Sequence, residues 1–356
     1  MVKETKTIDG YVLDENEYKI ELTEVDNKTE IVSESLKLTN KFEKGELEFT
    51  KTDLVTGETI PNTIIEIYTE DDKLIFTGIT NEDGKIIIKN LKIGKYYIIE
   101  KEPTTGYVLN KDKVYFEIKE NGEVVKASMT NKPITGKLEF TKTDLSMDKP
   151  LPNTLIEIYN ALTDEMIFSG RTDENGKIII DELRYGKYYI IEKDAPEGYT
   201  LNTEKMYFEI LEDGEIIKSL MKDEIITGTL EFTKIDLSTS NPLPNTLIEI
   251  YTDKDELVYS GKTDENGKIV IEELKYGKYY IIEKDAPEGY TLNTEKIYFE
   301  ILEDGEIVKA TMSNEKIVEV PNTFKDDNLT YVMLGLIVLG SGVVTYGIIK
   351  NKKKNK

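Results

Sequence analysis

Each of three similar segments of this sequence directs one Lys, one Glu and one Asn or Asp toward the apolar side of its predicted strands. Successive side chains of a strand point to opposite faces, so residues two apart share a face. Lys51 therefore lies on the same side as Leu47 and Phe49, and the other candidates follow apolar residues in the same alternation. The candidates are Lys51, Glu100 and Asn131 in the first segment, Lys142, Glu192 and Asp223 in the second, and Lys234, Glu283 and Asn314 in the third.

Buried together, these three types of side chain have the chemistry to form an amide bond. An isolated ion in an apolar interior costs several kcal/mol or changes its protonation state. Desolvation favours the neutral amine of Lys and the protonated carboxyl of Glu. A neutral amine can attack the carboxamide or carboxyl carbon beside it, while the Glu polarises the carbonyl and transfers protons. An Asn would release ammonia and an Asp would release water, and proximity alone supplies effective molarities of roughly 10⁵–10⁸ M.

A plain buried ion pair between Lys and Glu, capped by an Asn, is the simpler alternative for any single segment. The Lys and the Glu are separated by 49, 50 and 49 residues in the three segments, and this repetition argues against independent accidents. We therefore predict three catalysts and three cross-links. The catalysts are Glu100, Glu192 and Glu283, and the cross-links join Lys51 to Asn131, Lys142 to Asp223 and Lys234 to Asn314.

The composition removes most other chemistry. The 356 residues contain no Cys and no His, which excludes Ser-His-Asp and Cys-His catalysis, the usual zinc sites and disulfides. A net charge of -23 argues against nucleic-acid binding. The acidic TDENG turns lack the ligand spacing of a calcium loop, so no metal and no cofactor is predicted.

A glycosidase with paired carboxylates is the enzyme alternative. The candidate carboxylates, however, recur in every segment, whereas a hydrolase needs one cleft. We therefore predict no enzyme activity other than self-cross-linking.

Internal repetition predicts the fold. The segment LEFTKTDL begins at Leu47 and at Leu138, and LEFTKIDL begins at Leu230. Each repeat contains about eight short alternating runs rich in Ile, Tyr, Phe, Val and Thr, separated by turn residues, which is typical of an antiparallel β-sandwich. Pairs such as Asp83-Gly84 and Asn175-Gly176 favour tight hairpins. The predicted class is all-β, with tandem sandwich repeats.

We predict the domains to be 44–135, 136–227 and 228–318, joined by connections too short for flexible tethers, so that they form a semi-rigid rod. Residues 1–43 match the second half of a repeat, with Glu4 and Asn40 in the places of Glu100 and Asn131. No Lys partner exists for this pair in the chain, so no bond is predicted there. The partial repeat and the missing signal peptide lead us to expect further sequence upstream.

The Lys in an FTKxD strand, the Glu in YIIEKxAPxGY and the terminal Asn or Asp resemble the Cna B-type domains of Gram-positive pilins and adhesin stalks, also called SpaA-like or prealbumin-like domains. The resemblance implies an immunoglobulin-like or prealbumin-like sandwich and an autocatalytic isopeptide bond with the Glu as catalyst. The first repeat departs slightly, with Glu102-Pro103-Thr104-Thr105 where the others read Asp-Ala-Pro-Glu.

The C-terminal segment 319–356 reads as an export and anchoring signal. An uncharged run over 329–349 is long enough for a transmembrane helix, and the Lys-rich tail 350–356 is expected to remain in the cytoplasm. Upstream, 320–324 resembles the LPXTG motif of cell-wall sorting signals, where a sortase joins the Thr to peptidoglycan. Its residues are Val320, Pro321, Asn322, Thr323 and Phe324, and Val and Phe depart from the motif. A plain membrane anchor is the alternative.

The predicted function is that of a structural stalk, on a cell-wall-anchored surface protein or adhesin. The expected partners are a sortase, peptidoglycan and, through the C-terminal helix, the membrane. Two alternatives stay open: repeats that bind a host extracellular-matrix ligand directly, and a pilin subunit.

Overall fold

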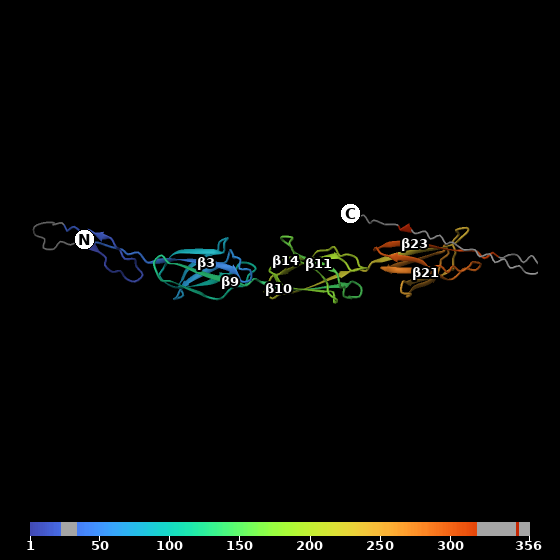
Figure 1. Ribbon diagram of the computed structural model, residues 1–356, viewed down its shortest axis with the longest axis horizontal. Coiled ribbons are helices and arrows are strands. Elements are labelled where there is room, and N and C mark those ends of the chain that lie inside the picture. The colour runs from blue at the N-terminus through green and yellow to red at the C-terminus, as the bar shows by residue number, and fades with distance from the viewer. Residues whose placement is uncertain (23–33, 319–346, 349–356) are drawn as a thin grey trace, which may run out of the picture.

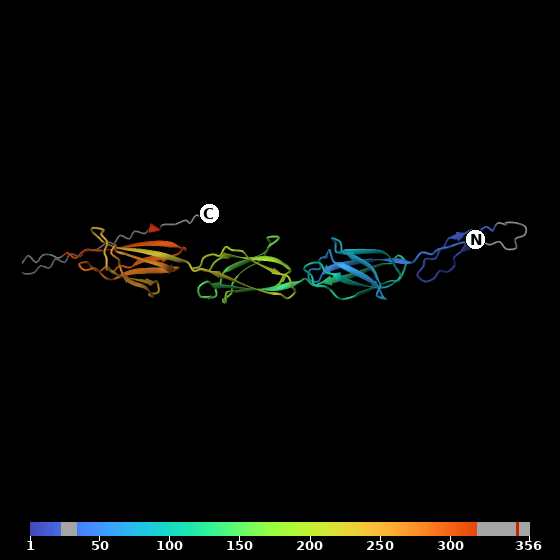
Figure 2. The ribbon, with the colours of Figure 1, turned by 180° about the vertical axis from the view of Figure 1, so that it is seen from behind.

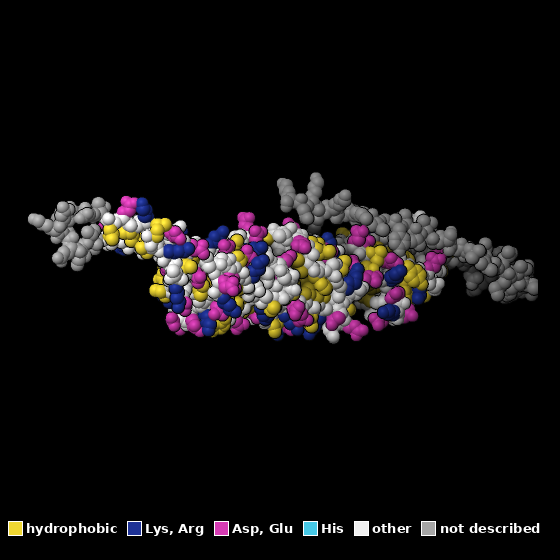
Figure 3. All heavy atoms as spheres, turned by 60° about the vertical axis from the view of Figure 1, so that its left-hand side comes forward, with side chains coloured by type: hydrophobic (Ala, Val, Ile, Leu, Met, Phe, Trp, Pro, Cys, Tyr) yellow, Lys and Arg dark blue, Asp and Glu magenta, His cyan; other side chains and the backbone are white. Residues whose placement is uncertain are grey.

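The computed structural model describes residues 1–22, 34–318 and 347–348. Three strand-built repeats follow one another in a row from the N-terminal to the C-terminal side (Figure 1), and the view from behind shows the same succession (Figure 2). Acidic and basic side chains are interspersed over the face drawn in Figure 3, so on that face the net negative charge is not gathered into one patch.

Each repeat consists of seven strands, one fewer than the sequence pattern predicts. The first contains β3 (Lys44–Asp53), β4 (Ile64–Thr69), β5 (Leu74–Ile79), β6 (Lys85–Lys92), β7 (Gly94–Glu102), β8 (Val114–Ile118) and β9 (Val124–Asn131). The second contains β10 (Thr135–Asp144), β11 (Leu155–Asn160), β12 (Met166–Arg171), β13 (Lys177–Arg184), β14 (Gly186–Asp194), β15 (Met206–Ile210) and β16 (Ile216–Asp223). The third contains β17 (Thr227–Asp236), β18 (Leu247–Thr252), β19 (Leu257–Lys262), β20 (Lys268–Lys275), β21 (Gly277–Asp285), β22 (Ile297–Ile301) and β23 (Glu306–Asn314).

Two sheets build every repeat, as the all-β sandwich prediction requires. In the first repeat, a four-stranded antiparallel sheet has the order β5-β4-β7-β8, and a three-stranded sheet has the order β6-β3-β9. The smaller sheet is not wholly antiparallel, because β3 pairs with β6 antiparallel but with β9 parallel. The first and the last strand of a repeat are thus neighbours that run in the same direction, an arrangement that residue alternation does not reveal.

The glycine turns at the ends of β5 and β8 connect the two sheets. Since β5 belongs to the larger sheet and β6 to the smaller, the turn at Asp83-Gly84 is not the hairpin that its sequence suggests, and the same holds for Asn175-Gly176 in the second repeat. Gly84 has a φ of +67°, and a Cβ on it would lie 2.8 Å from backbone atoms of Ile60 and Lys51. Glycine is therefore needed for close approach of this crossover to β3.

The core of each repeat lies between its sheets. Residues of β3 alternate strictly between buried and partly exposed, so that Leu47, Phe49 and Lys51 all point inward. Ile67 and Ile98 of the larger sheet face them. Full burial of one such aliphatic or aromatic side chain contributes about 1.5–3 kcal/mol, and this apolar layer is what deprives the inward Lys of water.

Outside the three repeats, the described residues form only short strands. The strands β1 (Val2–Lys3) and β2 (Glu17–Tyr18) pair antiparallel near the N-terminus, and β24 (Gly347–Ile348) pairs antiparallel with β23. The predicted motif 320–324 and the tail 350–356 lie outside the described residues, as does the predicted span 329–349 apart from β24. No helix within 1–22, 34–318 or 347–348 is long and apolar enough to cross a membrane.

Successive repeats contact each other through side chains next to the short connections. At the first junction, Arg184 Nη1 donates to Asp53 Oδ2 at 2.9 Å, and Lys132 Nζ donates to Asp213 Oδ2 at 2.7 Å. Burial alone would raise the pKa of Asp53, but the amides of Thr56 and Val55, together with Arg184 and Tyr107, lower it to about 2. The Asp53 carboxylate is thus held charged against the next repeat.

The second junction shares one contact with the first and differs in its polar contacts. The ring of Tyr276 lies against Gly198, as that of Tyr185 lies against Gly106 in the first junction, and the hydroxyl of Tyr276 donates to Glu197 Oε1 at 2.8 Å. Lys275 stands where the first junction has Arg184, and no ion pair of Lys275 occurs among the described residues.

We predict that Arg184→Ala widens the range of orientations between the first and second repeats. Because the Arg184 side chain is 43% exposed, the pair contributes little to folding, about 1 kcal/mol or less; its effect is on the angle between repeats. Distance distributions between spin labels on the two repeats measure it. The matched variant Lys275→Ala should leave the second junction unchanged, and identical distributions for Arg184→Ala and the unaltered protein would contradict the prediction.

Candidate functional site

The three predicted residues of each repeat meet inside its core. In the first repeat, Lys51 comes from β3, Asn131 from the end of its parallel neighbour β9, and Glu100 from β7 in the facing sheet. Lys51 is opposite Met129 in the strand pairing, so Asn131 lies one inward position further along β9. The register therefore brings the amine and the carboxamide together diagonally across two adjacent strands.

All three sites are closed to water. The side chains of the three Lys and of their Glu partners are fully buried, with 0% exposure. Lys51 Nζ lies 3.3 Å from Glu100 Oε1, and Lys234 Nζ lies 3.3 Å from Glu283 Oε2. In the second repeat Lys142 Nζ donates to Glu192 Oε2 at 3.1 Å.

Repeats one and three orient their Asn in the same way. Asn131 Nδ2 donates to Glu100 Oε1 at 2.7 Å, and Asn314 Nδ2 donates to Glu283 Oε1 at 2.6 Å. The buried Oδ1 atoms of both Asn have no hydrogen-bond donor among the described residues. The nitrogen that would leave in an amide exchange thus contacts the Glu, and the carbonyl stays unpaired.

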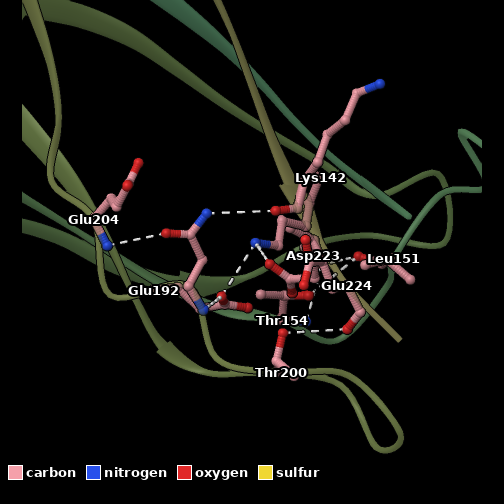
Figure 4. Close-up of polar contacts among 11 residues, drawn as sticks. Lys142, Leu151, Thr154, Glu192, Thr200, Glu204, Asp223 and Glu224 are labelled. Carbon is pink, nitrogen blue, oxygen red and sulfur yellow. Dashed lines mark hydrogen bonds and ion pairs between the residues drawn. The ribbon is translucent and has the colours of Figure 1, made fainter. Parts of the chain in front are cut away.

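Repeat two contains an ion pair instead of a carboxamide contact. Lys142 Nζ also donates to Asp223 Oδ1, so this Lys binds both carboxylates (Figure 4). Figure 4 shows the three side chains converging from three strands. Repeat two thus has the Asp223 carboxylate where the other repeats have a neutral carboxamide. The Lys142 amine balances the charge of this carboxylate.

Burial changes the protonation of these groups. Desolvation lowers the pKa of Lys51, against the opposing attraction of Glu100. Desolvation also lowers the pKa of Lys234 to about 8, although the attraction of Glu283 acts in the opposite direction. In the second repeat, desolvation is the largest cause that raises the pKa of Glu192 to about 7, while the Asn202 amide and Lys142 act in the opposite direction. Near neutral pH a neutral amine is therefore accessible at Lys234 and a protonated carboxyl at Glu192.

The partial repeat contains the same pair without a Lys. Asn40 Nδ2 donates to Glu4 Oε1 at 2.6 Å, and Glu4 Oε2 accepts the amide of Asp14 at 2.8 Å. These contacts reproduce those of Glu100, Asn131 and Asn110 in the first repeat.

The sequence did not lead us to predict one contact at each site, a backbone amide that binds the Glu. The backbone amides of Asn110, Asn202 and Asn293 donate to Oε2 of Glu100, Glu192 and Glu283 at 2.6, 2.8 and 2.7 Å. The signal was present, because an Asn follows each Glu by ten residues. Within the described residues no group of three or more metal-ligating side chains occurs.

Comparison with known proteins gives this geometry a context. A trypsin-resistant surface T6 protein of Streptococcus pyogenes is 25% identical over 216 residues, covering 60% of this chain and 31% of the relative. A fibrinogen-binding protein of Staphylococcus epidermidis is 26% identical over 203 residues, covering 51% and 18%. The chain therefore spans less than a third of the length of these curated relatives, the first of which is named as a surface protein.

A solved structure, the Bacillus anthracis TIE protein, is 38% identical with a TM-score of 0.67, covering 78% of this chain and 52% of that one. Residues 45–133, 136–225 and 228–316 each match the SpaA family, described as a prealbumin-like fold domain. Three matched segments occupy most of the chain, and the strand order and buried Lys are the same in all of them. The chain belongs to the SpaA family of prealbumin-like fold domains, which it contains three times in tandem.

Proposed function

We propose that this chain is the stalk of a cell-wall-anchored surface protein, in which each repeat is closed by an autocatalytic amide bond from Lys to Asn or Asp. The observation that carries the proposal is that a fully buried Lys, a buried Glu and a buried Asn or Asp meet three times at equivalent positions of the fold. The succession of repeats in a row supports the role of a spacer (Figure 1).

The reaction in repeats one and three is an amide exchange. The neutral Nζ of Lys attacks Cγ of the Asn and forms a new C–N bond, while the bond from Cγ to Nδ2 breaks. The Glu takes the proton that the attacking amine loses and delivers it to Nδ2, which its Oε1 already contacts. Ammonia departs, and the Glu returns to its starting state.

The reaction in repeat two begins from an ion pair and is therefore slower. Before attack, the Lys142 amine must lose a proton and the Asp223 carboxylate must gain one, because a carboxylate carbon is a poor electrophile. Glu192, with its pKa raised to about 7, lies 3.1 Å from the amine and provides the route for that proton. Here the leaving group is water.

The anchoring part of the proposal belongs to residues 320–324, 329–349 and 350–356. A sortase would join Thr323 to peptidoglycan, and the apolar span followed by the Lys-rich tail would retain the protein at the membrane before or without that step. Direct binding of a host ligand is the second candidate function, favoured by the match to a relative named a fibrinogen-binding protein.

We predict that the intact mass of the purified chain is lower than the sequence mass by two ammonia molecules and one water molecule. Glu100→Ala removes the proton carrier of repeat one and should restore one ammonia. Glu102→Ala, an exposed position two residues further along the same strand, is the matched control. Its measured mass should still be lower than the mass of its own sequence by two ammonia molecules and one water molecule. A mass equal to that of the sequence would overturn the proposal.

We further predict that the type of acceptor, Asn or Asp, determines which of repeats one and two forms its bond faster. Asp223→Asn should speed bond formation in repeat two by removing the ion pair, and Asn131→Asp should slow it in repeat one. Time courses start from chain that is kept in urea from its synthesis onward, so that no repeat has folded or formed its bond, and mass spectrometry follows the cross-linked peptides after dilution into buffer. Repeat three, unaltered in both variants, is the internal standard. Unchanged rates would show that the ion pair does not limit the reaction.

We also predict that bond formation in repeat three accelerates by about tenfold per pH unit as pH rises from 6 to 8. The reason is that the neutral fraction of Lys234 grows until the pH reaches its pKa of about 8. Before reaction, the free energy of unfolding should rise above pH 8, since the unfolded Lys binds a proton that the folded Lys has lost. The same dilution assay at several pH values measures the rate. A rate independent of pH over this range would contradict the assignment of Lys234 as nucleophile.

A further inference from the structure

The loop before the fourth strand of the larger sheet contacts both the catalytic Glu and the backbone of the last strand, which carries the acceptor. In the first repeat it connects β7 to β8, and Asn110 within it makes three kinds of hydrogen bond. Its backbone amide donates to Glu100 Oε2 at 2.6 Å, and its side-chain Nδ2 donates to the carbonyl of Thr130 at 2.8 Å. Thr130 is the residue directly before the acceptor Asn131, so one residue connects the proton carrier to the acceptor strand.

The third hydrogen bond shapes the loop itself. Asn110 Oδ1 accepts the amide of Asp112 at 2.9 Å, a local turn that directs the Asn110 amide toward the Glu. Repeat three reproduces the set, with Asn293 donating to Glu283 at 2.7 Å and to the Ser313 carbonyl at 3.0 Å. Repeat two has a longer contact, 3.4 Å from Asn202 Nδ2 to the Lys222 carbonyl.

The acceptor is held from both sides. The amide of Val108, from the same loop, donates to the carbonyl of Lys132 at 2.9 Å, and the amide of Leu54, beyond β3, donates to the carbonyl of Asn131 at 2.9 Å. Three successive carbonyls, before, at and after the acceptor, are therefore bound. Of these three bonds, the one to Thr130 comes from the residue that also binds the Glu.

We infer that Asn110, Asn202 and Asn293 are positioning residues for the cross-linking reaction, each setting the distance between its catalytic Glu and the acceptor on the last strand. The inference rests on the proposed function. The partial repeat gives a natural contrast, because Asp14 occupies this position, binds Glu4 through its amide and has no side-chain N–H for the acceptor strand. These Asn do not touch the reacting atoms, so they act through the Glu and the strand.

The test uses the full chain with Asn293→Ser or Asn293→Ala. Both substitutions retain the backbone amide on Glu283 and remove the bond to Ser313, while the Ser hydroxyl can still accept from Glu295 and preserve the turn. Because small displacements of reacting groups are costly, we expect bond formation in repeat three to slow by about ten- to a hundredfold in both variants. Repeats one and two serve as internal standards, and Asn266→Ser, in an exposed turn, is the matched surface control.

A second readout separates positioning from loss of structure. The pH at which the rate reaches half of its plateau should stay near that of the unaltered chain, because burial of Lys234 is unchanged. The plateau rate itself should fall. The melting temperature in a background that cannot react, Asn314→Ala, should also stay unchanged. If Asn293→Ser reacts at the full rate, or if the half-plateau pH and the melting temperature fall together with the rate, the positioning role is wrong. If the unaltered repeat three forms no bond, the proposed function and this inference both fail.

Discussion

The exclusion of water from one Lys in each repeat is the constraint on which the structure depends. A charged amine is stable in an apolar interior only when its ion pairs and hydrogen bonds offset desolvation, and here that requires a carboxylate from the facing sheet. Both sheets must therefore be present and in register before the Lys is accommodated. Lys51, Glu100 and Asn131 come from three strands separated by most of the repeat, so their meeting couples the ends of the repeat to its middle.

Much of this could be predicted from local patterns. Alternation along the strands identified Lys51 and Glu100 as inward residues, and their nearly equal spacing in the three repeats supported their pairing. The two-sheet, all-strand class also followed from runs of β-formers separated by glycine turns. These inferences succeed because a strand's faces are determined by residue parity, a property that the sequence contains without reference to the rest of the chain.

Other features depend on contacts between distant segments and were not predictable in this way. The parallel pairing of β3 with β9 depends on which sheet each strand joins, and the turn at Asp83-Gly84 has the composition of a hairpin although it connects two sheets. Asn110 contacts Glu100 through its backbone amide, a group that every residue but proline possesses, so residue type by itself does not predict this contact. The ion pair of Arg184 with Asp53 joins different repeats, and only the packing of one repeat against the next shows it.

The parallel pair also determines how a repeat responds to mechanical force. Because β3 and β9 run in the same direction, the chain enters a repeat at one pole and leaves it at the other, and tension along the row pulls these two strands lengthwise past each other. Their ladder hydrogen bonds then share the force at the same time instead of opening one after another. The intervening strands, β4 to β8, lie outside the direct path between the two poles. Extension of the row would therefore be resisted mainly by the smaller sheet, and the larger sheet would be shielded from it.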